Sequence, residues 1–215
     1  MDGAARRERL ARARLYLVID ARPHGREPDA LLAAALRGGV DIVQLRDKEL
    51  PAEELVRAST PFRRACDAAG ALFVLNDRPD LVDACGADGV HVGQEDEPVA
   101  KARALVGAER LVGLSTHSRA EMDAATGVDY IGVGTIFATP TKPDSNAVGL
   151  DLVRAASAAA RVPWFAIGGI ELANVGLVAK AGARGVAVVR AIRDAADPEA
   201  AARALRAALG EPPRT

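Results

Sequence analysis

Short apolar runs and longer amphipathic segments alternate along the whole chain. Most of the apolar runs are continuous and rich in Val, Ile and Leu, which is typical of strands buried on both faces of a parallel sheet. Runs of this kind predict eight strands, over residues 15–20, 40–46, 72–77, 88–93, 111–115, 129–134, 163–169 and 185–190.

The segments between these runs have helical periodicity and clear start and stop signals. They cover residues 28–38, 51–70, 98–108, 118–126, 151–161, 172–182 and 197–210. Pro51, Ser118 and Asp197 stand at helix starts, each followed by glutamate within the first turn. Gly70 and Gly210 stand where helices should end. The chain is therefore predicted to alternate strictly between strand and helix.

Strict alternation of this kind predicts an α/β protein, and eight units predict a (β/α)8 TIM barrel. We expect a basic N-terminal helix or tail over residues 1–14, one compact catalytic barrel over 15–210, and a C-terminal tail over 211–215. A doubly wound sheet is the alternative. It would be expected to show a Gly-rich turn after the first strand, and "VIDARPHG" at residues 18–25 has none.

The composition of the chain limits the kinds of molecule that it is expected to bind. Its 215 residues carry a net charge of -1, so there is no overall attraction to nucleic acid or to anionic membranes. Aromatic residues make up only 3%, which argues against base-stacking surfaces. Cys66 and Cys85 lack metal or redox spacing and are expected to be reduced thiols. We see neither a signal peptide nor an apolar segment of membrane-spanning length, so we expect a cytoplasmic protein. We expect its partners to be small molecules. Assembly into a homo-oligomer is possible.

Polar residues gather where the predicted strands end. The run "VDIVQLRDK", residues 40–48, begins apolar and finishes in long polar side chains. Residues two apart on a strand share a face, so Gln44 and Arg46 point the same way, joined by Lys48 if the strand continues. Active sites of TIM barrels lie at the C-terminal ends of their strands. This cluster is therefore predicted to bind an anion there.

Asp77 and Asp96 follow neighbouring predicted strands, so both lie at the rim of the barrel where the strands end. Two carboxylates with open positions suit Mg²⁺, which keeps waters and accepts substrate phosphate oxygens. The alternative is that Asp77 caps the next helix and that residues 95–97 form a solvated turn. The positive charge of the neighbouring Arg46 and Lys48 favours the metal–diphosphate interpretation.

Two further segments suggest phosphate binding. In "ATPTKP", residues 138–143, Thr139 and Thr141 offer hydroxyls and Lys142 a mobile charge, although a solvated proline loop is the alternative. In "AIGGI", residues 166–170, the glycine pair suits a phosphate cradled by backbone N–H groups, or simply close strand-to-helix packing. Among the histidines, His91 is expected to be a hydrogen-bonded core residue and His117 to lie near a substrate.

The motifs closely resemble those of the thiamine-phosphate synthase family, in the same order. They are "QLRDK", "LNDR", "GVHVGQED", "GLSTHS", "DYIGVGTIFATPTK" and "AIGGI", and the resemblance extends from about Tyr16 to Ile192. It implies a transferase of thiamine biosynthesis that joins a hydroxymethylpyrimidine diphosphate to a thiazole phosphate, releasing diphosphate by a dissociative substitution. It also implies Mg²⁺ as cofactor.

The resemblance assigns roles by motif. It implies that Asp77 and Asp96 bind Mg²⁺. It implies contacts with the pyrimidine diphosphate from Gln44, Arg46, Lys48, Asn76, Ser115 and Lys142. At the thiazole-phosphate end it implies contacts from Thr139, Thr141, Gly169, Val189 and Arg190. Catalytic roles are implied for Arg46, Lys48, Ser115 and Lys142. One departure is Arg190, where many relatives have Ser.

Three alternatives remain at this point. A thiazole tautomerase-like isomerase would share the barrel and the phosphate end but would need no diphosphate–Mg²⁺ site. A non-catalytic phosphate-binding barrel would tolerate loss of the two aspartates. A general phosphosugar enzyme would be expected to show an acid–base pair, and none is assigned. The combination of Gln44, Arg46, Lys48, Asp77 and Asp96 favours the synthase.

Overall fold

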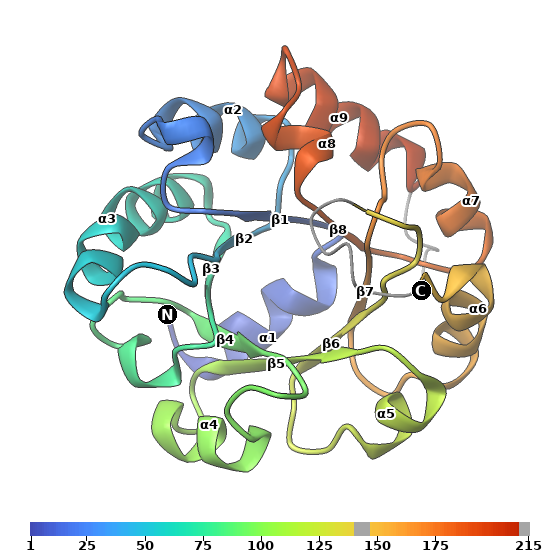
Figure 1. Cartoon of the computed structure of the whole chain (residues 1–215), viewed down its shortest axis with the longest axis horizontal. Coiled ribbons are helices and arrows are strands. Elements are labelled where there is room, and N and C mark those ends of the chain that lie inside the picture. Colours follow the sequence, from blue (N-terminus) through green and yellow to red (C-terminus); the bar gives the residue numbers. More distant parts are fainter. Residues whose placement is uncertain (140–146, 211–215) are drawn as a thin grey trace.

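The computed structural model of the chain describes residues 1–139 and 147–210. Its strands form one closed parallel barrel in which each strand pairs with its neighbours in sequence, and β8 pairs back to β1 (Figure 1). The strands are β1 (Leu15–Ile19), β2 (Ile42–Leu45), β3 (Leu72–Asn76), β4 (Gly89–Val92), β5 (Leu111–Thr116), β6 (Tyr130–Val133), β7 (Trp164–Ile167) and β8 (Val186–Val188). The predicted TIM barrel is confirmed, and a doubly wound sheet is excluded.

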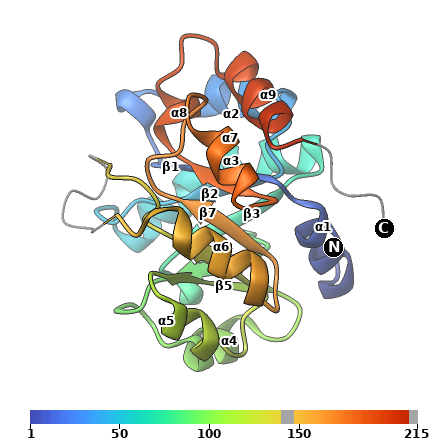
Figure 2. The same ribbon diagram turned by 90° about the vertical axis from the view of Figure 1, so that its right-hand side faces the viewer.

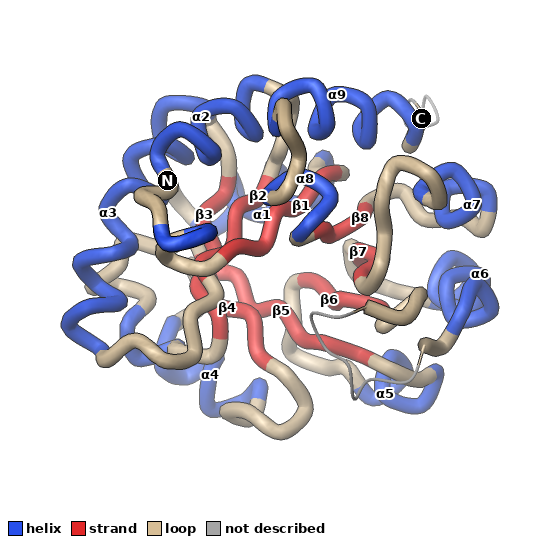
Figure 3. Tube along the Cα trace, turned by 45° about the horizontal axis from the view of Figure 1, so that its top comes forward, coloured by secondary structure: helices blue, strands red, loops and turns tan. Residues whose placement is uncertain are grey.

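Helices surround the ring of strands (Figure 3). The α-helices are α1 (Gly3–Arg12), α2 (Asp29–Arg37), α3 (Ala52–Ala69), α4 (Val99–Val106), α5 (Arg119–Ala124), α6 (Gly149–Ala159), α7 (Val175–Lys180), α8 (Arg190–Arg193) and α9 (Pro198–Ala208). Two 3-10 turns, η1 (Pro23–Gly25) and η2 (Pro79–Leu81), follow β1 and β3. The predicted caps at Ser118 and Asp197 are present, since their side chains accept from the N–H of Glu121 and Ala200. Within the described residues no helix is long and apolar enough to cross a membrane.

The hydrophobic core has two parts. The larger part lies between the strands and the outer helices. The smaller fills the inside of the barrel and consists of Leu10, Tyr16, Val18, Ile42, Leu72, Val74, Leu111, Tyr130, Phe165 and Ala187. Most of these are interior positions of the strands, as expected for side chains that alternate between the inside and outside of a barrel. Three aromatic rings therefore occupy the centre of the barrel.

Helix α1 covers the N-terminal end of the barrel. Figure 2 shows it set apart from the other helices at one end of the molecule. The Asp2 side chain caps this helix, and Leu10 is 2% exposed because it packs into the barrel interior. Arg6 and Arg7 bind Asp88 and Asp129, which lie at the starts of β4 and β6. The basic N-terminal segment is thus a folded part of the barrel in the structure.

A repeated pattern organises this end of the barrel. Asp41, Asp88 and Asp129 immediately precede β2, β4 and β6, and each accepts a hydrogen bond from the backbone of the preceding strand. The donors are the N–H groups of Leu15 at 3.0 Å, Phe73 at 3.0 Å and Val112 at 2.8 Å. Each aspartate is also paired with arginine. These carboxylates therefore fix strand starts in pairs around the ring.

The same pattern includes glycine two residues before each of these aspartates. Gly39, Gly86 and Gly127 have positive φ values of 99°, 64° and 73°. Such a backbone conformation costs other residues about 1 kcal/mol or more, so glycine suits these sharp turns. The fourth even-numbered strand, β8, also follows a glycine with positive φ, Gly182 at 110°, but this glycine lies one residue farther from its strand, and Gly185 instead of an aspartate immediately precedes β8. The barrel thus has a fourfold repeat that is incomplete in one quarter.

Candidate active site

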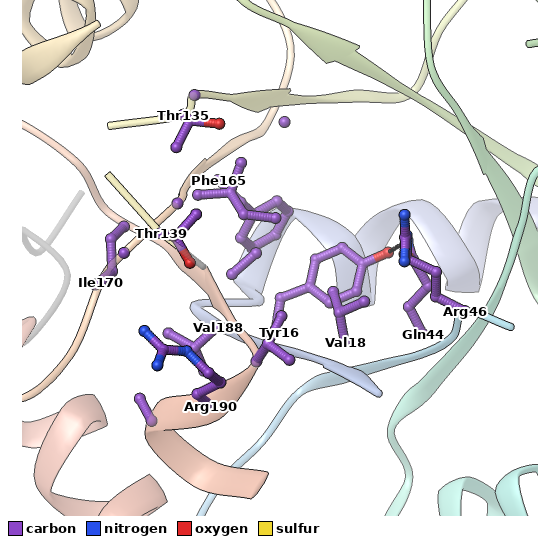
Figure 4. Close-up of a pocket in the computed structure, with 18 of the residues that line it drawn as sticks. Tyr16, Val18, Gln44, Arg46, Thr135, Thr139, Phe165, Ile170, Val188 and Arg190 are labelled. Carbon is purple, nitrogen blue, oxygen red and sulfur yellow. Dashed lines mark hydrogen bonds between the residues drawn. The ribbon is translucent and has the colours of Figure 1, made fainter. Parts of the chain in front are cut away.

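A cavity of about 430 Å³ opens at the C-terminal ends of the strands. It brings together predicted site residues from across the sequence: Gln44, Arg46, Asn76, Ser115, Thr139, Gly169, Val189 and Arg190. In the view of Figure 4, Gln44 and Arg46 lie at one end, Thr139 and Arg190 lie toward the other, and the Tyr16 ring lies between them. The cavity can therefore hold two anionic groups that are separated by an aromatic floor.

The predicted metal ligands form a second cluster beside this cavity. Lys48 Nζ lies 3.0 Å from Asp77 Oδ2 and 3.8 Å from Asp96 Oδ1. The Asp77 backbone N–H donates to His91 O at 2.9 Å, and Asp96 Oδ2 accepts from Gly93 N–H at 2.9 Å. The 3-10 turn η2 that follows has no side-chain cap, so Asp77 does not cap it. The rim therefore contains two carboxylates that share Lys48, with the Asp77 backbone bound to β4 and the Asp96 side chain bound within its own loop.

The pKa of Asp77 is set by opposing influences from its surroundings. Burial raises the pKa of Asp77, and the neighbouring Asp96 raises it further, while the hydrogen bond from Lys48 lowers it, with a net upward shift. Two carboxylates this close repel each other when both are ionised. A cation bound between them would remove that repulsion. The two carboxylates are oxygen donors of the kind that Mg²⁺ prefers, so their chemistry fits this ion.

Lys48 reaches this cluster by a route that strand alternation does not explain. Strand β2 ends at Leu45, so Lys48 lies three residues beyond it, and the condition that the strand continues is not met. A turn takes its place, in which Asp47 Oδ1 accepts from the N–H groups of Glu49 at 3.2 Å and Leu50 at 3.3 Å. Asp47 is thus a structural residue that directs the loop toward the rim.

The loop after β6 is described only in part. Thr139 lines the cavity, whereas Thr141 and Lys142 lie outside the described residues. Gly168 and Gly169 follow β7 with φ values of 106° and 61° and also line the cavity. A Cβ on Gly168 would lie 2.4 Å from Thr135 Cγ2, and one on Gly169 would lie 2.8 Å from Ala138 O. The glycine pair therefore permits close packing as well as access to the cavity.

Several lining residues were not selected from the sequence. Tyr16, Tyr130 and Phe165 form the cavity floor, with the Phe165 ring edge-on to both tyrosine rings. His91 was expected in the core; it is hydrogen-bonded as expected, but it lines the cavity. His117, which is predicted from the sequence to lie near a substrate, lines the cavity as well, and its Nδ1 contacts Gly134 O. The signal for the tyrosines was a hydroxyl inside an otherwise apolar strand, which needs a polar partner when it is buried.

Comparison with known proteins gives one family. The model of the family described as thiamine monophosphate synthase matches residues 15–192. The thiamine-phosphate synthase of Streptomyces avermitilis is 52% identical over 200 residues, covering 91% of this chain and 93% of the relative. That of Thermobifida fusca is 51% identical over 208 residues, covering 94% and 95%.

A solved structure supports the same assignment. Thiamine phosphate pyrophosphorylase from Pyrococcus furiosus superposes with a TM-score of 0.84 at 33% identity, covering 94% of this chain and 96% of that one. A 3-hexulose-6-phosphate synthase superposes with a TM-score of 0.65 at 24% identity, which indicates a shared fold only. By its sequence over most of its length and by its structure, the chain belongs to the thiamine monophosphate synthase family.

Proposed function

We propose that the rim of this barrel binds a pyrimidine diphosphate and a thiazole phosphate side by side, with Mg²⁺ between Asp77 and Asp96. The chain is a transferase that joins a pyrimidine and a thiazole unit to give thiamine phosphate. The observation that supports this arrangement best is the pair of carboxylates with Lys48 between them, next to a cavity that has an arginine toward each end.

The reaction exchanges one bond for another at a single methylene carbon. The bond from that carbon to the diphosphate oxygen breaks, and its electron pair leaves with the diphosphate. The lone pair of the thiazole nitrogen then forms the new carbon–nitrogen bond. The protein needs no nucleophile for this chemistry. Its task is to hold both substrates in line and to stabilise the charge on the leaving diphosphate.

Arg46 and Lys48 suit the diphosphate. Arg46 offers a planar set of N–H donors, and Lys48 a compact charge, both at the rim where β2 ends. Asn76, at the end of β3, lines the cavity between them and Ser115. Mg²⁺ held by Asp77 and Asp96 would supply further positive charge to the diphosphate oxygens. Lys142, outside the described residues, is proposed to reach the same group.

The thiazole phosphate is assigned to the opposite end. Gly169, Val189 and Arg190 line the cavity there, together with Thr139. Gly169 lines the cavity and has no side chain, so its backbone can come close to a phosphate. The guanidinium of Arg190 offers paired donors to the same phosphate. Thr141 is proposed to contribute from the undescribed part of the loop.

We place this reaction in the cytoplasm, with small molecules as the partners. Cys66 and Cys85 are both free and buried, and burial raises the pKa of Cys66 to about 12, so this thiol is unreactive. Such thiols suit a reducing compartment.

The decisive experiment is a synthesis assay on the purified chain. Pyrimidine diphosphate and Mg²⁺ are supplied with and without thiazole phosphate, and thiamine phosphate and diphosphate are both quantified. We expect thiamine phosphate only with both substrates and Mg²⁺, in equal amount to diphosphate. Product that forms equally well with chelator would overturn the metal assignment. Isomerisation of a thiazole phosphate without condensation would favour the tautomerase-like alternative.

A further inference from the structure

A chain of hydrogen bonds crosses the floor of the cavity. Gln44 Nε2 lies 2.7 Å from Tyr16 Oη, and Tyr16 Oη lies 3.0 Å from Tyr130 Oη. Tyr130 Oη lies 3.2 Å from His91 Nδ1, and His91 Nε2 lies 2.9 Å from Ser115 Oγ. The two ends, Gln44 on β2 and Ser115 on β5, are both residues assigned to the pyrimidine. Figure 4 shows the Tyr16 hydroxyl directed at Gln44.

The surrounding structure makes room for this chain. Tyr16 and Tyr130 are 2% and 0% exposed. A Cβ on Gly113 would lie 2.2 Å from Tyr130 Cζ and 2.6 Å from His91 Nδ1, so glycine is required there for the rings to meet. Gly132, opposite Ser115 in the sheet, also lies beside the His91 ring, but a Cβ there would be 3.5 Å from His91 Cε1, an ordinary van der Waals contact. The close approach of the two rings therefore depends on the missing side chain of Gly113 on β5.

Each hydroxyl in the chain has one proton to donate. Burial raises the pKa of both tyrosines, so both phenols stay protonated. A phenol that accepts a hydrogen bond from one neighbour therefore donates its proton to the next. All hydrogen bonds in the network then run in the same direction. Because the Gln44 amide nitrogen donates to Tyr16, Tyr16 donates to Tyr130 and Tyr130 to His91 Nδ1. His91 must then be the neutral tautomer with its proton on Nε2, donating to Ser115 Oγ.

We propose that Tyr16, Tyr130 and His91 are positioning residues that fix which end of the pyrimidine site accepts a hydrogen bond and which end donates one. With this direction, Gln44 turns its carbonyl oxygen to the cavity and Ser115 turns its O–H to it. The site then selects a heteroaromatic ring that has an amino donor for Gln44 and a ring nitrogen acceptor for Ser115. This inference rests on the proposed function, because it concerns the pyrimidine half of that same site.

The first test needs no substrate. The protein contains three histidines, so ¹⁵N NMR of the histidine side chains can assign the tautomer of each one. We expect neutral His91 with the proton on Nε2, and a shift of its Nδ1 resonance in Tyr130→Phe while that of His24, outside the cavity, stays unchanged. A proton on Nδ1 of His91 in the wild type would overturn the proposed direction.

The second test measures recognition with two pyrimidine diphosphates, one with the amino group and one with an oxo group in its place. The ratio of their kcat/KM values cancels general losses of activity. We expect Tyr16→Phe and Tyr130→Phe to lower this ratio about tenfold, the effect of about one hydrogen bond, because Gln44 can then present either its oxygen or its nitrogen. If one variant does not fold, the other gives the same test.

Phe62→Leu is the matched control, because Phe62 is a fully buried aromatic residue that stacks on Phe73 and lies outside the cavity and the hydrogen-bonded network. Its ratio should equal that of the wild type even if its stability is lower. Equal loss on both analogues in Tyr16→Phe and Tyr130→Phe would mean that the tyrosines serve packing only, and would overturn the proposal. A wild type that makes no thiamine phosphate would refute the proposed function instead, and the His91 tautomer would still decide the direction of the chain.

Discussion

The ammonium group of Lys48 lies 3.0 Å from a carboxylate oxygen of Asp77, at the position proposed for Mg²⁺. Lysine and metal would therefore compete for the same carboxylates. With Mg²⁺ and the diphosphate bound, Lys48 would be free to turn from the carboxylates to the diphosphate. We therefore expect this side chain to balance the charge of the carboxylates before the metal binds and to contact the diphosphate during the reaction.

This competition predicts opposite effects in Lys48→Ala. Without the ammonium group, Mg²⁺ should bind the free protein several-fold more tightly, because Lys48 no longer competes for the carboxylates. Turnover should nevertheless fall by about a hundredfold, since charge at the leaving diphosphate is lost. Calorimetric titration with Mg²⁺ and steady-state kinetics measure the two effects. Lys101→Ala, which removes an exposed pair with Glu97, is the control for loss of a surface charge.

We expect Mg²⁺ to raise the melting temperature of the wild type, and Asp77→Asn and Asp96→Asn should each abolish this rise. Both variants should fold, because neither carboxylate is part of the core, and their turnover should fall by at least about a hundredfold. Thermal unfolding with and without Mg²⁺ gives a readout independent of activity. Asp123→Asn, in an exposed pair with Arg119 on α5, should respond to Mg²⁺ as the wild type does. A full Mg²⁺ response in the Asp77→Asn, Asp96→Asn double variant would refute the metal site.

Arg46 and Arg190, the two cavity arginines assigned to substrates, should have separable effects. Arg46→Ala should raise the KM for the pyrimidine diphosphate by about tenfold to a hundredfold and change that for the thiazole phosphate little, since one charge-assisted contact is worth about 1.5–3 kcal/mol. Arg190→Ala should show the reverse pattern. Each KM is measured with the other substrate saturating. Equal effects of Arg46→Ala on both substrates would mean that the two ends of the cavity are wrongly assigned.

Asp88→Asn should lower stability without altering catalysis by the folded protein. Asp88 binds Arg6, Arg63 and the Phe73 N–H at the end of the barrel opposite the site, and Arg6 is only 6% exposed. Removing one partner of a buried pair costs about 3–5 kcal/mol. Urea unfolding measures the loss. Asp67→Asn removes an exposed partner of the same Arg63 and should cost less than about 1 kcal/mol.

The same residue has a predicted effect on acid stability. Burial alone would raise the pKa of Asp88, but the hydrogen bonds from Arg63 and from the Phe73 N–H outweigh it and lower the pKa. The Asp88 carboxylate therefore binds its proton more tightly in the unfolded chain than in the folded one. Its contribution to the stability of the fold is present above about pH 4 and is lost as the pH falls through the lowered pKa. Stability in Asp88→Asn should therefore decline less steeply in acid than in the wild type.

Gly113→Ala should be severely destabilising, because its Cβ would enter the Tyr130 ring in the barrel interior. Overpacking of this kind typically costs about 1–3 kcal/mol or more. Gly176→Ala is the matched control: it lies within α7, has no close neighbour, and should gain up to about 1 kcal/mol in helix propensity. Both are compared by urea unfolding. A stable Gly113→Ala with unchanged NMR signals of His91 would contradict the described packing.

Periodicity was sufficient to predict the barrel, because buried parallel strands require continuous apolar runs and their helices require an apolar stripe. It also placed Gln44, Asn76 and Ser115 at one rim, since parallel strands bring their ends together. Residues beyond the strands were harder to place. The position of Lys48 depends on a turn made by Asp47, and such loop geometry has no simple period.

Residues inside the barrel were missed for a different reason. Tyr16 and Tyr130 occur in apolar runs and satisfy the same pattern as Val or Leu, so the pattern alone treats them as core. Their hydroxyls become significant only when β1 and β6 are seen to face each other across the barrel. The sequence likewise showed no sign of the repeated pattern that runs from Gly39 to Asp41. Its aspartate binds the backbone of a neighbouring strand, and such a contact is not visible within one segment.

Helix α1 has a kinetic consequence. Because it covers the far end of the barrel and sends Leu10 into the interior, both substrates must enter, and both products leave, through the opening at the rim. A substrate that lies deeper than its partner is then expected to arrive first and depart last. With the pyrimidine against the tyrosine floor, we expect ordered binding with the pyrimidine diphosphate as the leading substrate, and inhibition by thiamine phosphate that is competitive with it.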